Sequence, residues 1–153
     1  MNLDLWAQTV HAVAGMLWVG GIFFAYMALR PAAEGLAPPE RLALWRRTFS
    51  RFFPWVWLFI GLLLASGYWD LFARFGGFGG PRHLAVMHWV GLLMTALFTY
   101  LYFLPYRALG RALTAGDLAA AAAAMRRIRP VMAINLGLGI FNTLVGVAGP
   151  ALG

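Results

Sequence analysis

The chain has 153 residues, of which 62% are hydrophobic and 11% are charged, and its formal net charge is +7. A soluble domain of this length could not bury so much apolar surface, so the composition indicates an integral membrane protein. The basic charge comes from arginine alone, and the absence of cysteine excludes disulfides, thiolate metal sites and cysteine nucleophiles. Because the arginines flank apolar segments, they indicate contacts with the lipid bilayer, and we expect no binding of nucleic acid.

Four apolar segments are long enough to cross the hydrocarbon core of a bilayer, which needs about 20 residues in a helix. They cover residues 6–29, 52–72, 83–106 and 128–148. We therefore predict an all-α fold, in which residues 1–153 form one integral membrane four-helix bundle. An even number of spans places both ends of the chain on the same side of the membrane.

The arginines are distributed very unevenly between the two sides. Ten of them lie in the loops after spans one and three or at the ends of those loops, whereas only Arg74 and Arg82 lie between spans two and three. The positive-inside rule then predicts that the two basic loops are cytoplasmic and that both termini face outward, an N-out/C-out topology. We expect residues 38–52 to form a short amphipathic helix at the inner interface before span two. Asp117 is expected to cap a cytoplasmic extension of span four.

Two histidines are the strongest candidates for function. His11 lies five residues inside the outer boundary of span one, and His88 lies five residues inside that of span three. These spans run in the same direction, so both side chains are expected at the same depth, roughly 7 Å below the outer interface. An ionisable side chain within the membrane needs a partner. Two histidines on facing helices of a bundle can hold a cofactor, and imidazole is a ligand of both haem iron and copper.

The neighbours of these histidines favour haem. Gly15 and Gly91 lie one helical turn from His11 and His88, and they leave room for a flat macrocycle, although small residues also serve as plain helix contacts. The other candidates for a haem pocket are Trp18, Thr95 and Asn142. Asn135 lies on the same helix face as Asn142. The two predict either hydrogen bonds to the side chains that hold the ligand or contacts between helices.

Copper is the alternative ligand. In that hypothesis His11 and His88 bind the ion, and His83, which lies at the outer boundary of span three, joins them as a third metal ligand. His83 is also compatible with having no ligand at all. The seven methionines lack the clustered M-x-x-M spacing of a copper(I) path, and Met87 is expected to point about 100° away from its neighbour His88.

The first span carries a specific pattern, in which His11 is followed seven residues later by Trp18-Val19-Gly20-Gly21. With this pattern, the segment VMHWVGLLM around His88 and the segment NLGLG from Asn135, the chain resembles the CopD family of membrane proteins. The resemblance covers most of the chain. It implies a plasma-membrane protein linked to copper uptake or resistance, corresponding to the four-helix part of larger relatives.

The same pattern is similar to the HemJ-type protoporphyrinogen oxidases, four-helix haem proteins with a histidine in the first span. In that family the histidine of span three is followed two residues later by a lysine, where this chain has Val90 and contains no lysine anywhere. This departure disfavours protoporphyrinogen oxidation and leaves the two histidine ligands in place. The plan is also similar to that of small membrane b-type cytochromes, which exchange electrons with quinols.

Our first hypothesis is therefore a cytochrome of the bacterial inner (plasma) membrane, with haem b bound by His11 and His88 near the periplasmic face. Two axial imidazoles leave no open position on the iron, which favours electron transfer over oxygen binding. A quinol, superoxide or a periplasmic redox protein would be the electron partner. A haem-dependent oxidoreductase activity stays open, as does assembly into a homodimer. The alternative is a copper transport or resistance protein, and the third hypothesis is a haem enzyme of the porphyrin-oxidising type.

Overall fold

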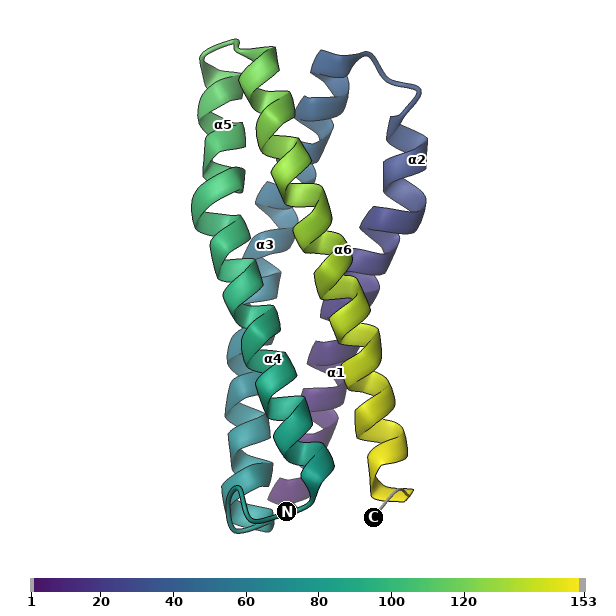
Figure 1. Ribbon diagram of the computed structural model, residues 1–153, viewed down its shortest axis with the longest axis vertical. Coiled ribbons are helices and arrows are strands. Elements are labelled where there is room, and N and C mark those ends of the chain that lie inside the picture. Colours follow the sequence, from purple (N-terminus) through teal and green to yellow (C-terminus); the bar gives the residue numbers. More distant parts are fainter. Residues whose placement is uncertain (1, 152–153) are drawn as a thin grey trace.

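The computed structural model describes residues 2–151, and all regular structure within that range is helical (Figure 1). The α-helices are α1 (Leu3–Phe24), α2 (Arg30–Ala33), α3 (Pro38–Trp69), α4 (Arg82–Leu101), α5 (Arg107–Thr114) and α6 (Leu118–Ala148). Three π-helical turns connect or extend them, at Ala25–Leu29, Asp70–Arg74 and Tyr102–Tyr106, and a 3-10 turn follows at Gly149–Ala151. The predicted all-α fold is confirmed.

Together these elements make four rods, and each is long and apolar enough to cross a membrane. The rods are Leu3–Ala33, Pro38–Arg74, Arg82–Thr114 and Leu118–Ala151. The second has 37 residues, which corresponds to about 55 Å of helix. The hydrocarbon core is about 30 Å thick, so the rods extend well beyond it. The protein is thus a multi-pass membrane protein whose bundle is longer than the membrane core.

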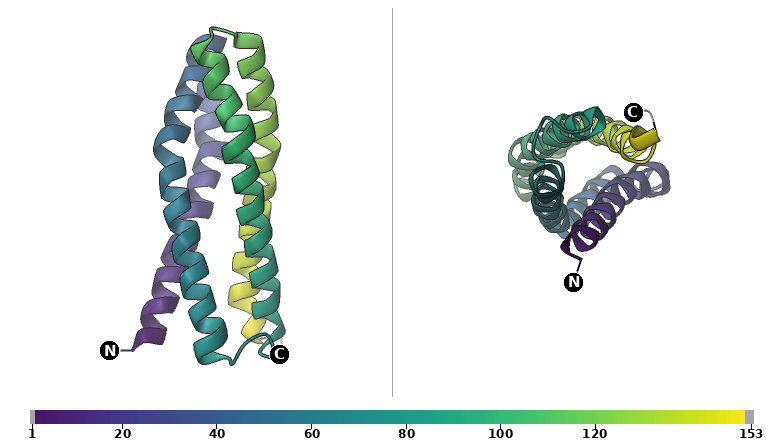
Figure 2. Two further views of the ribbon diagram at one scale, coloured as in Figure 1. Left: turned by 90° about the vertical axis from the view of Figure 1, so that its left-hand side faces the viewer. Right: turned by 90° about the horizontal axis from the view of Figure 1, so that it is seen from below.

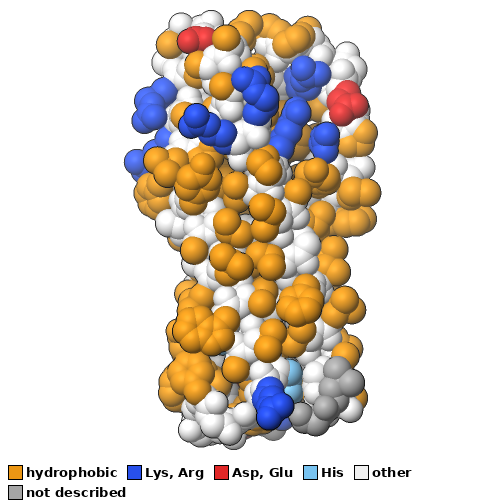
Figure 3. Space-filling model, in the orientation of Figure 1, with side chains coloured by type: hydrophobic (Ala, Val, Ile, Leu, Met, Phe, Trp, Pro, Cys, Tyr) orange, Lys and Arg blue, Asp and Glu red, His pale blue; other side chains and the backbone are white. Residues whose placement is uncertain are grey.

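The two ends of the bundle differ in charge. Both chain ends and the loop after the second rod lie at one end, which we call the terminal end (Figure 1). The loops between α2 and α3 and between α5 and α6 lie at the other end, and Figure 3 shows the arginines as a belt near it. We call this the arginine end. The surface between the belt and the terminal end is largely apolar (Figure 3), as expected where lipid surrounds the protein.

The prediction of a separate amphipathic helix over residues 38–52 is wrong, because α3 runs without interruption from Pro38 to Trp69. Leu42, Trp45 and Phe49 are buried, and their spacing continues one apolar stripe along α3 into the bundle core. Pro54 lies inside α3 and removes only one backbone hydrogen-bond donor. The stripe therefore packs the start of α3 on the bundle instead of leaving it on the membrane surface.

The predicted extension of the fourth span is confirmed. Asp117 accepts a hydrogen bond of 2.8 Å from the backbone N–H of Ala120 and so caps α6, which begins at Leu118. The helix then continues without a break to Ala148. α6 packs against α5 and against α4.

The four rods surround a common axis (Figure 2), with α1 packed mainly on α3 and α4 packed mainly on α6. Between α3 and the third rod, Arg82–Thr114, the space is filled by aromatic rings that we call the aromatic cluster. Its members are Phe49, Phe53, Trp57, Phe98, Tyr102 and Tyr106. Phe53 lies at its centre, with its ring 5.2 Å from that of Phe98 and 4.8 Å from that of Tyr106. On α1, Trp18 extends the cluster by an edge contact of 6.3 Å with Phe98.

Candidate functional site

A cavity of about 760 Å³ lies between α1, α3, α4 and α6, on the terminal side of the aromatic cluster. The structure brings together in its lining all the residues proposed from sequence for a haem pocket. They are His11, Gly15, Trp18, His88, Gly91, Thr95 and Asn142. No member of the aromatic cluster lines the cavity, but on α1 the lining continues past Trp18 to Gly20 and Phe23.

His11 is held in a defined orientation by a serine on α3. Its Nδ1 atom lies 2.9 Å from the hydroxyl oxygen of Ser66, and that hydroxyl donates its own proton to the carbonyl of Leu62 at 2.6 Å. A hydroxyl has a single proton, so Nδ1 of His11 must be the donor in the bond to Ser66. The neutral imidazole then carries its free lone pair on Nε2, the state that a metal ion or haem iron requires.

A glycine next to Ser66 makes space for the imidazole. A Cβ atom on Gly67 would lie 3.2 Å from Cε1 of His11, which is tighter than ordinary contact, and 3.6 Å from its Nδ1 atom. Gly67 also lines the cavity. The close approach of α3 to His11 therefore depends on the absence of a side chain at this position.

His88 is held differently, by aromatic rings from three parts of the chain. Its ring makes edge contacts with Tyr68 of α3, with Phe78 of the loop before α4 and with its neighbour Trp89, at centroid distances of 5.3, 5.2 and 5.3 Å. Within residues 2–151 its nitrogens form no hydrogen bond. Packing thus orients the ring while both nitrogens stay available to a ligand.

His83 does not join the other two histidines, so the three-histidine copper site proposed from sequence does not form. A Cβ atom on Gly149 would overlap the side chain of His83, which shows that His83 packs directly on the turn after α6. His83 does not line the cavity. In the described part of the chain, no three His, Cys, Asp or Glu side chains come together as a metal site. A metal ion bound here would therefore need at least one ligand of another kind besides the histidines.

Asp70 is a site residue that the sequence analysis did not identify. It lies one helical turn after Ser66 and lines the cavity, and its Oδ1 atom is buried without a hydrogen-bond partner. Arg74 lies four residues further on, but its guanidinium stacks 4.9 Å above the ring of Phe75 and forms no ion pair with Asp70. A carboxylate oxygen removed from water is stabilised by a cation or a donor, so Asp70 favours a positively charged ligand.

Methionines form a second group that the sequence analysis did not use. Met16, Met87 and Met94 all line the cavity. The last two lie seven residues apart on α4, and each packs over a glycine of α6. A Cβ atom would lie 3.0 Å from Cε of Met87 at Gly146 and 3.3 Å from Cε of Met94 at Gly139.

Two asparagines of α6 bind the backbone beside these methionines. Asn142 donates from Nδ2 to the carbonyl of Met87, and Asn135 donates in the same way to that of Met94, each at 3.4 Å. The Oδ1 atoms of both asparagines are buried and unbonded. The asparagines are therefore contacts between α4 and α6, and Asn142 also presents an unbonded polar atom at the cavity wall.

Some of these residues left a signal in the sequence. Ser66 and Asp70 are polar, four residues apart and close to the end of an apolar span, which predicts one shared helix face. The methionines gave a weaker signal, because unclustered methionines are ordinary filling of a helix core. Nothing in the sequence predicted that Met87 would share a cavity with His88, since neighbours on a helix diverge.

Comparison with known proteins adds one finding. The family described as Copper resistance protein D matches residues 46–148, which contain His88, Asp70, Met87 and Asn142 but not His11. No curated protein and no solved structure matches the chain significantly. The family match favours the copper hypothesis over the haem hypothesis. Since the matched segment spans well over half of the sequence, the chain belongs to the copper resistance protein D family.

Proposed function

We propose that this protein binds copper in the cavity near the terminal end of its bundle, as part of copper handling at a bacterial plasma membrane. His11 supplies Nε2 as the first ligand, and His88 and methionine thioethers supply the others. The observation that carries the proposal is the presence of His11, His88 and three methionines in the lining of one cavity.

The kinds of donor atom in the cavity favour copper over other metals. Thioether sulfur is a soft ligand that suits copper(I), whereas imidazole nitrogen suits copper in both common oxidation states. Magnesium and calcium prefer oxygen ligands throughout, and the cavity offers a single carboxylate, that of Asp70. Structural zinc sites usually contain cysteine, which this chain lacks.

Three of the proposed ligands, His11, Met87 and Met94, have a supporting residue behind them. Ser66 sets the tautomer of His11, and the asparagine contacts hold the backbone beside Met87 and Met94. Such supporting hydrogen bonds typically change metal affinity by about 10- to 100-fold when they are lost. Asp70 adds a negative charge that draws a cation toward the cavity.

A competition titration tests the proposal. Purified protein in neutral detergent would be titrated with copper(I) against a coloured copper(I) chelator, and with zinc(II) and magnesium(II) as comparison ions. We expect one copper(I) ion per chain with an affinity that falls at least about tenfold in His11→Ala. Equal binding by wild type and His11→Ala would contradict the proposal.

Haem b is a second candidate, favoured by the size of the cavity. Its volume of about 760 Å³ lies within the range of sites for small organic ligands and is far larger than one ion needs. A Cβ atom on Gly91 would meet nothing within 4 Å, so the cavity wall is open beside His88. His11 and His88 fit the role of axial ligands, and a bound haem would supply one-electron transfer. In that case a quinol or a periplasmic redox protein would be the electron partner.

The absorption spectrum of the purified protein distinguishes the two candidates. A Soret band with one haem per chain would favour haem b, and its loss in both His11→Ala and His88→Ala would assign the ligands. A colourless protein that binds copper(I) would favour copper. A colourless protein without copper(I) affinity would contradict both.

A further inference from the structure

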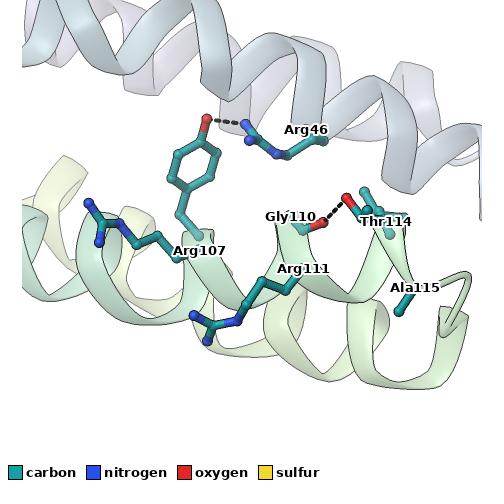
Figure 4. A pocket seen from close by; sticks show the side chains of 8 residues that line it. Arg46, Arg107, Gly110, Arg111, Thr114 and Ala115 are labelled. Atoms are coloured by element: carbon teal, nitrogen blue, oxygen red, sulfur yellow. Dashed lines mark hydrogen bonds between the residues drawn. The ribbon is translucent and has the colours of Figure 1, made fainter.

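A second hollow of about 740 Å³ lies at the arginine end (Figure 4), and it shares no lining residue with the cavity. Its lining includes three arginines, Arg46 from α3 and Arg107 and Arg111 from α5. Tyr106, Gly110 and Thr114 also line it. The proposed copper binding does not use this hollow, so its chemistry needs a separate explanation.

Arg46 is fixed at the back of the hollow. Its Nη1 donates a hydrogen bond to the hydroxyl of Tyr106, and its guanidinium carbon lies 4.5 Å from the centre of the same ring (Figure 4). A Cβ atom on Gly110 would lie 3.0 Å from Nε of Arg46, so α5 approaches this side chain as closely as a glycine allows. A guanidinium has five N–H donors, and the bond to Tyr106 uses one of them.

Arg107 and Arg111 are exposed and lie four residues apart on α5. Figure 4 shows both side chains extending away from the loop between α5 and α6, toward the middle of the bundle. Arg107 lies 4.8 Å above the ring of Phe103, in the same direction. Because the two arginines lie one helical turn apart and extend in the same direction, both guanidiniums can reach one ligand.

None of the three arginines is neutralised by a carboxylate. In the described part of the chain the ion pair is the one between Arg30 and Glu34, at 4.0 Å. Arg107 and Arg111 thus carry uncompensated positive charge one helical turn apart, and an anion that contacts both would be stabilised by both charges. Arginine pairs are especially suited to phosphate, because parallel N–H groups bind two phosphate oxygens at once.

We infer that the hollow binds a phosphate group, with the headgroup of an anionic phospholipid as its source. Phe103 and Leu104 support a lipid, since they precede Arg107 on the side of the membrane centre and expose 46% and 59% of their surface. An acyl chain can lie on these residues while its phosphate contacts Arg107 and Arg111. Basic pockets between membrane helices commonly bind anionic headgroups in this way. Inorganic phosphate shares the same chemistry and is the alternative source.

Lipid titration of the purified full-length protein tests the inference. The protein in neutral detergent would be titrated with phosphatidylglycerol, with phosphatidylcholine and with sodium phosphate, and bound lipid would be counted by native mass spectrometry. We expect one phosphatidylglycerol to bind preferentially. In Arg107→Gln/Arg111→Gln its affinity should fall by roughly tenfold or more, because two charge-assisted contacts are lost.

Two further variants separate a specific site from general charge. Arg126→Gln/Arg127→Gln removes two exposed arginines of α6 that do not line the hollow. The affinity of this variant for phosphatidylglycerol should differ from that of wild type by less than about threefold. Arg107→Lys/Arg111→Lys keeps the charge and should still weaken binding, since lysine cannot bind two oxygens in parallel. Circular dichroism and unfolding midpoints without lipid would verify that each variant is folded.

The outcomes are distinct. Binding of inorganic phosphate without preference for phosphatidylglycerol would keep the phosphate site and assign it to a soluble ligand. Equal losses in the α5 and α6 double variants would overturn the inference, because the arginine belt would then act as diffuse charge. Equal affinity for phosphatidylglycerol and phosphatidylcholine, with no effect of phosphate, would also overturn it.

Discussion

The imidazole of His11 on α1 donates a hydrogen bond of 2.9 Å to the hydroxyl of Ser66 on α3, across 55 positions of sequence. This bond joins the two helices and at the same time decides which nitrogen of His11 is free. The same hydrogen bond therefore holds α1 against α3 and leaves Nε2 of His11 free to bind a ligand.

Replacing Ser66 by alanine removes the acceptor for Nδ1–H of His11 without removing the imidazole. We expect Ser66→Ala to weaken copper(I) binding by about 10- to 100-fold, because the ring loses its fixed orientation and tautomer. The measurement is the chelator competition titration. Ser50→Ala is the matched control, since Ser50 is exposed and bonds only to the carbonyl of Arg47. Equal affinities in Ser66→Ala and wild type would show that the bond plays no part in binding.

Adding a methyl group at Gly67 should displace His11. The new Cβ atom would lie 3.2 Å from Cε1 of the imidazole, so the ring must shift by a few tenths of an ångström. We expect Gly67→Ala to weaken copper(I) binding by about tenfold while the unfolding midpoint stays close to that of wild type. Gly61→Ala on the same helix is the control, because a Cβ atom there meets nothing within 4 Å and should leave affinity unchanged.

Substitutions of the two histidines of α4 should differ in their effect on ligand binding. His88 lines the cavity and His83 does not, so His88→Ala should weaken copper binding or haem retention at least about tenfold, whereas His83→Ala should not. The same titration and the Soret absorbance of the purified variants measure this. Comparable losses in both variants would mean that the ligand lies closer to the end of α6 than the cavity does.

Asp70 should strengthen the binding of copper(II) through its negative charge. Asp70→Asn keeps the shape of the side chain and removes the negative charge, so we expect weaker binding of copper(II), by roughly fivefold to tenfold. Asp4→Asn is the matched control at the same end of the bundle, because its side-chain oxygen can still accept the bond of 3.1 Å from Nε1 of Trp69. Titration of both variants with copper(II) separates the local effect of Asp70 from the general charge of this end.

The orientation in the membrane follows from the arginine belt and is open to a direct test. A reporter active only in the periplasm should be active when fused to the C-terminus and inactive when inserted at Gly116, between α5 and α6. The physical reason is the excess of arginine in the loops at that end. Activity at Gly116 instead would reverse the orientation of the bundle.

Much of the fold could be predicted because membrane helices are constrained by length and hydrophobicity. The four spans and the extension of α6 beyond Asp117 follow from apolar runs and one capping residue. The continuity of α3 was missed, because arginines between Trp45 and Phe52 resemble the polar face of a surface helix. Tertiary packing keeps the start of α3 in the bundle, because α3 contacts α5 and α6.

The candidate site was only partly predictable. His11 and His88 could be related by depth, since two helices that run in the same direction carry them at equal distances from the membrane surface. Ser66, Gly67 and Asp70 could not be related to His11 in the same way. Their helix runs in the opposite direction, and rotation of α3 about its axis decides which of its residues meet the imidazole.

Trp18 has a consequence for how cargo would move. It lines the cavity, and from its edge contact with Phe98 the rings continue through Phe53 to Tyr106 near the arginine end. The aromatic rings thus close the core of the bundle between the cavity and the arginine end. An ion bound in the cavity could reach an acceptor at the terminal end without crossing these rings. Passage to the opposite side would require the stacked rings to separate.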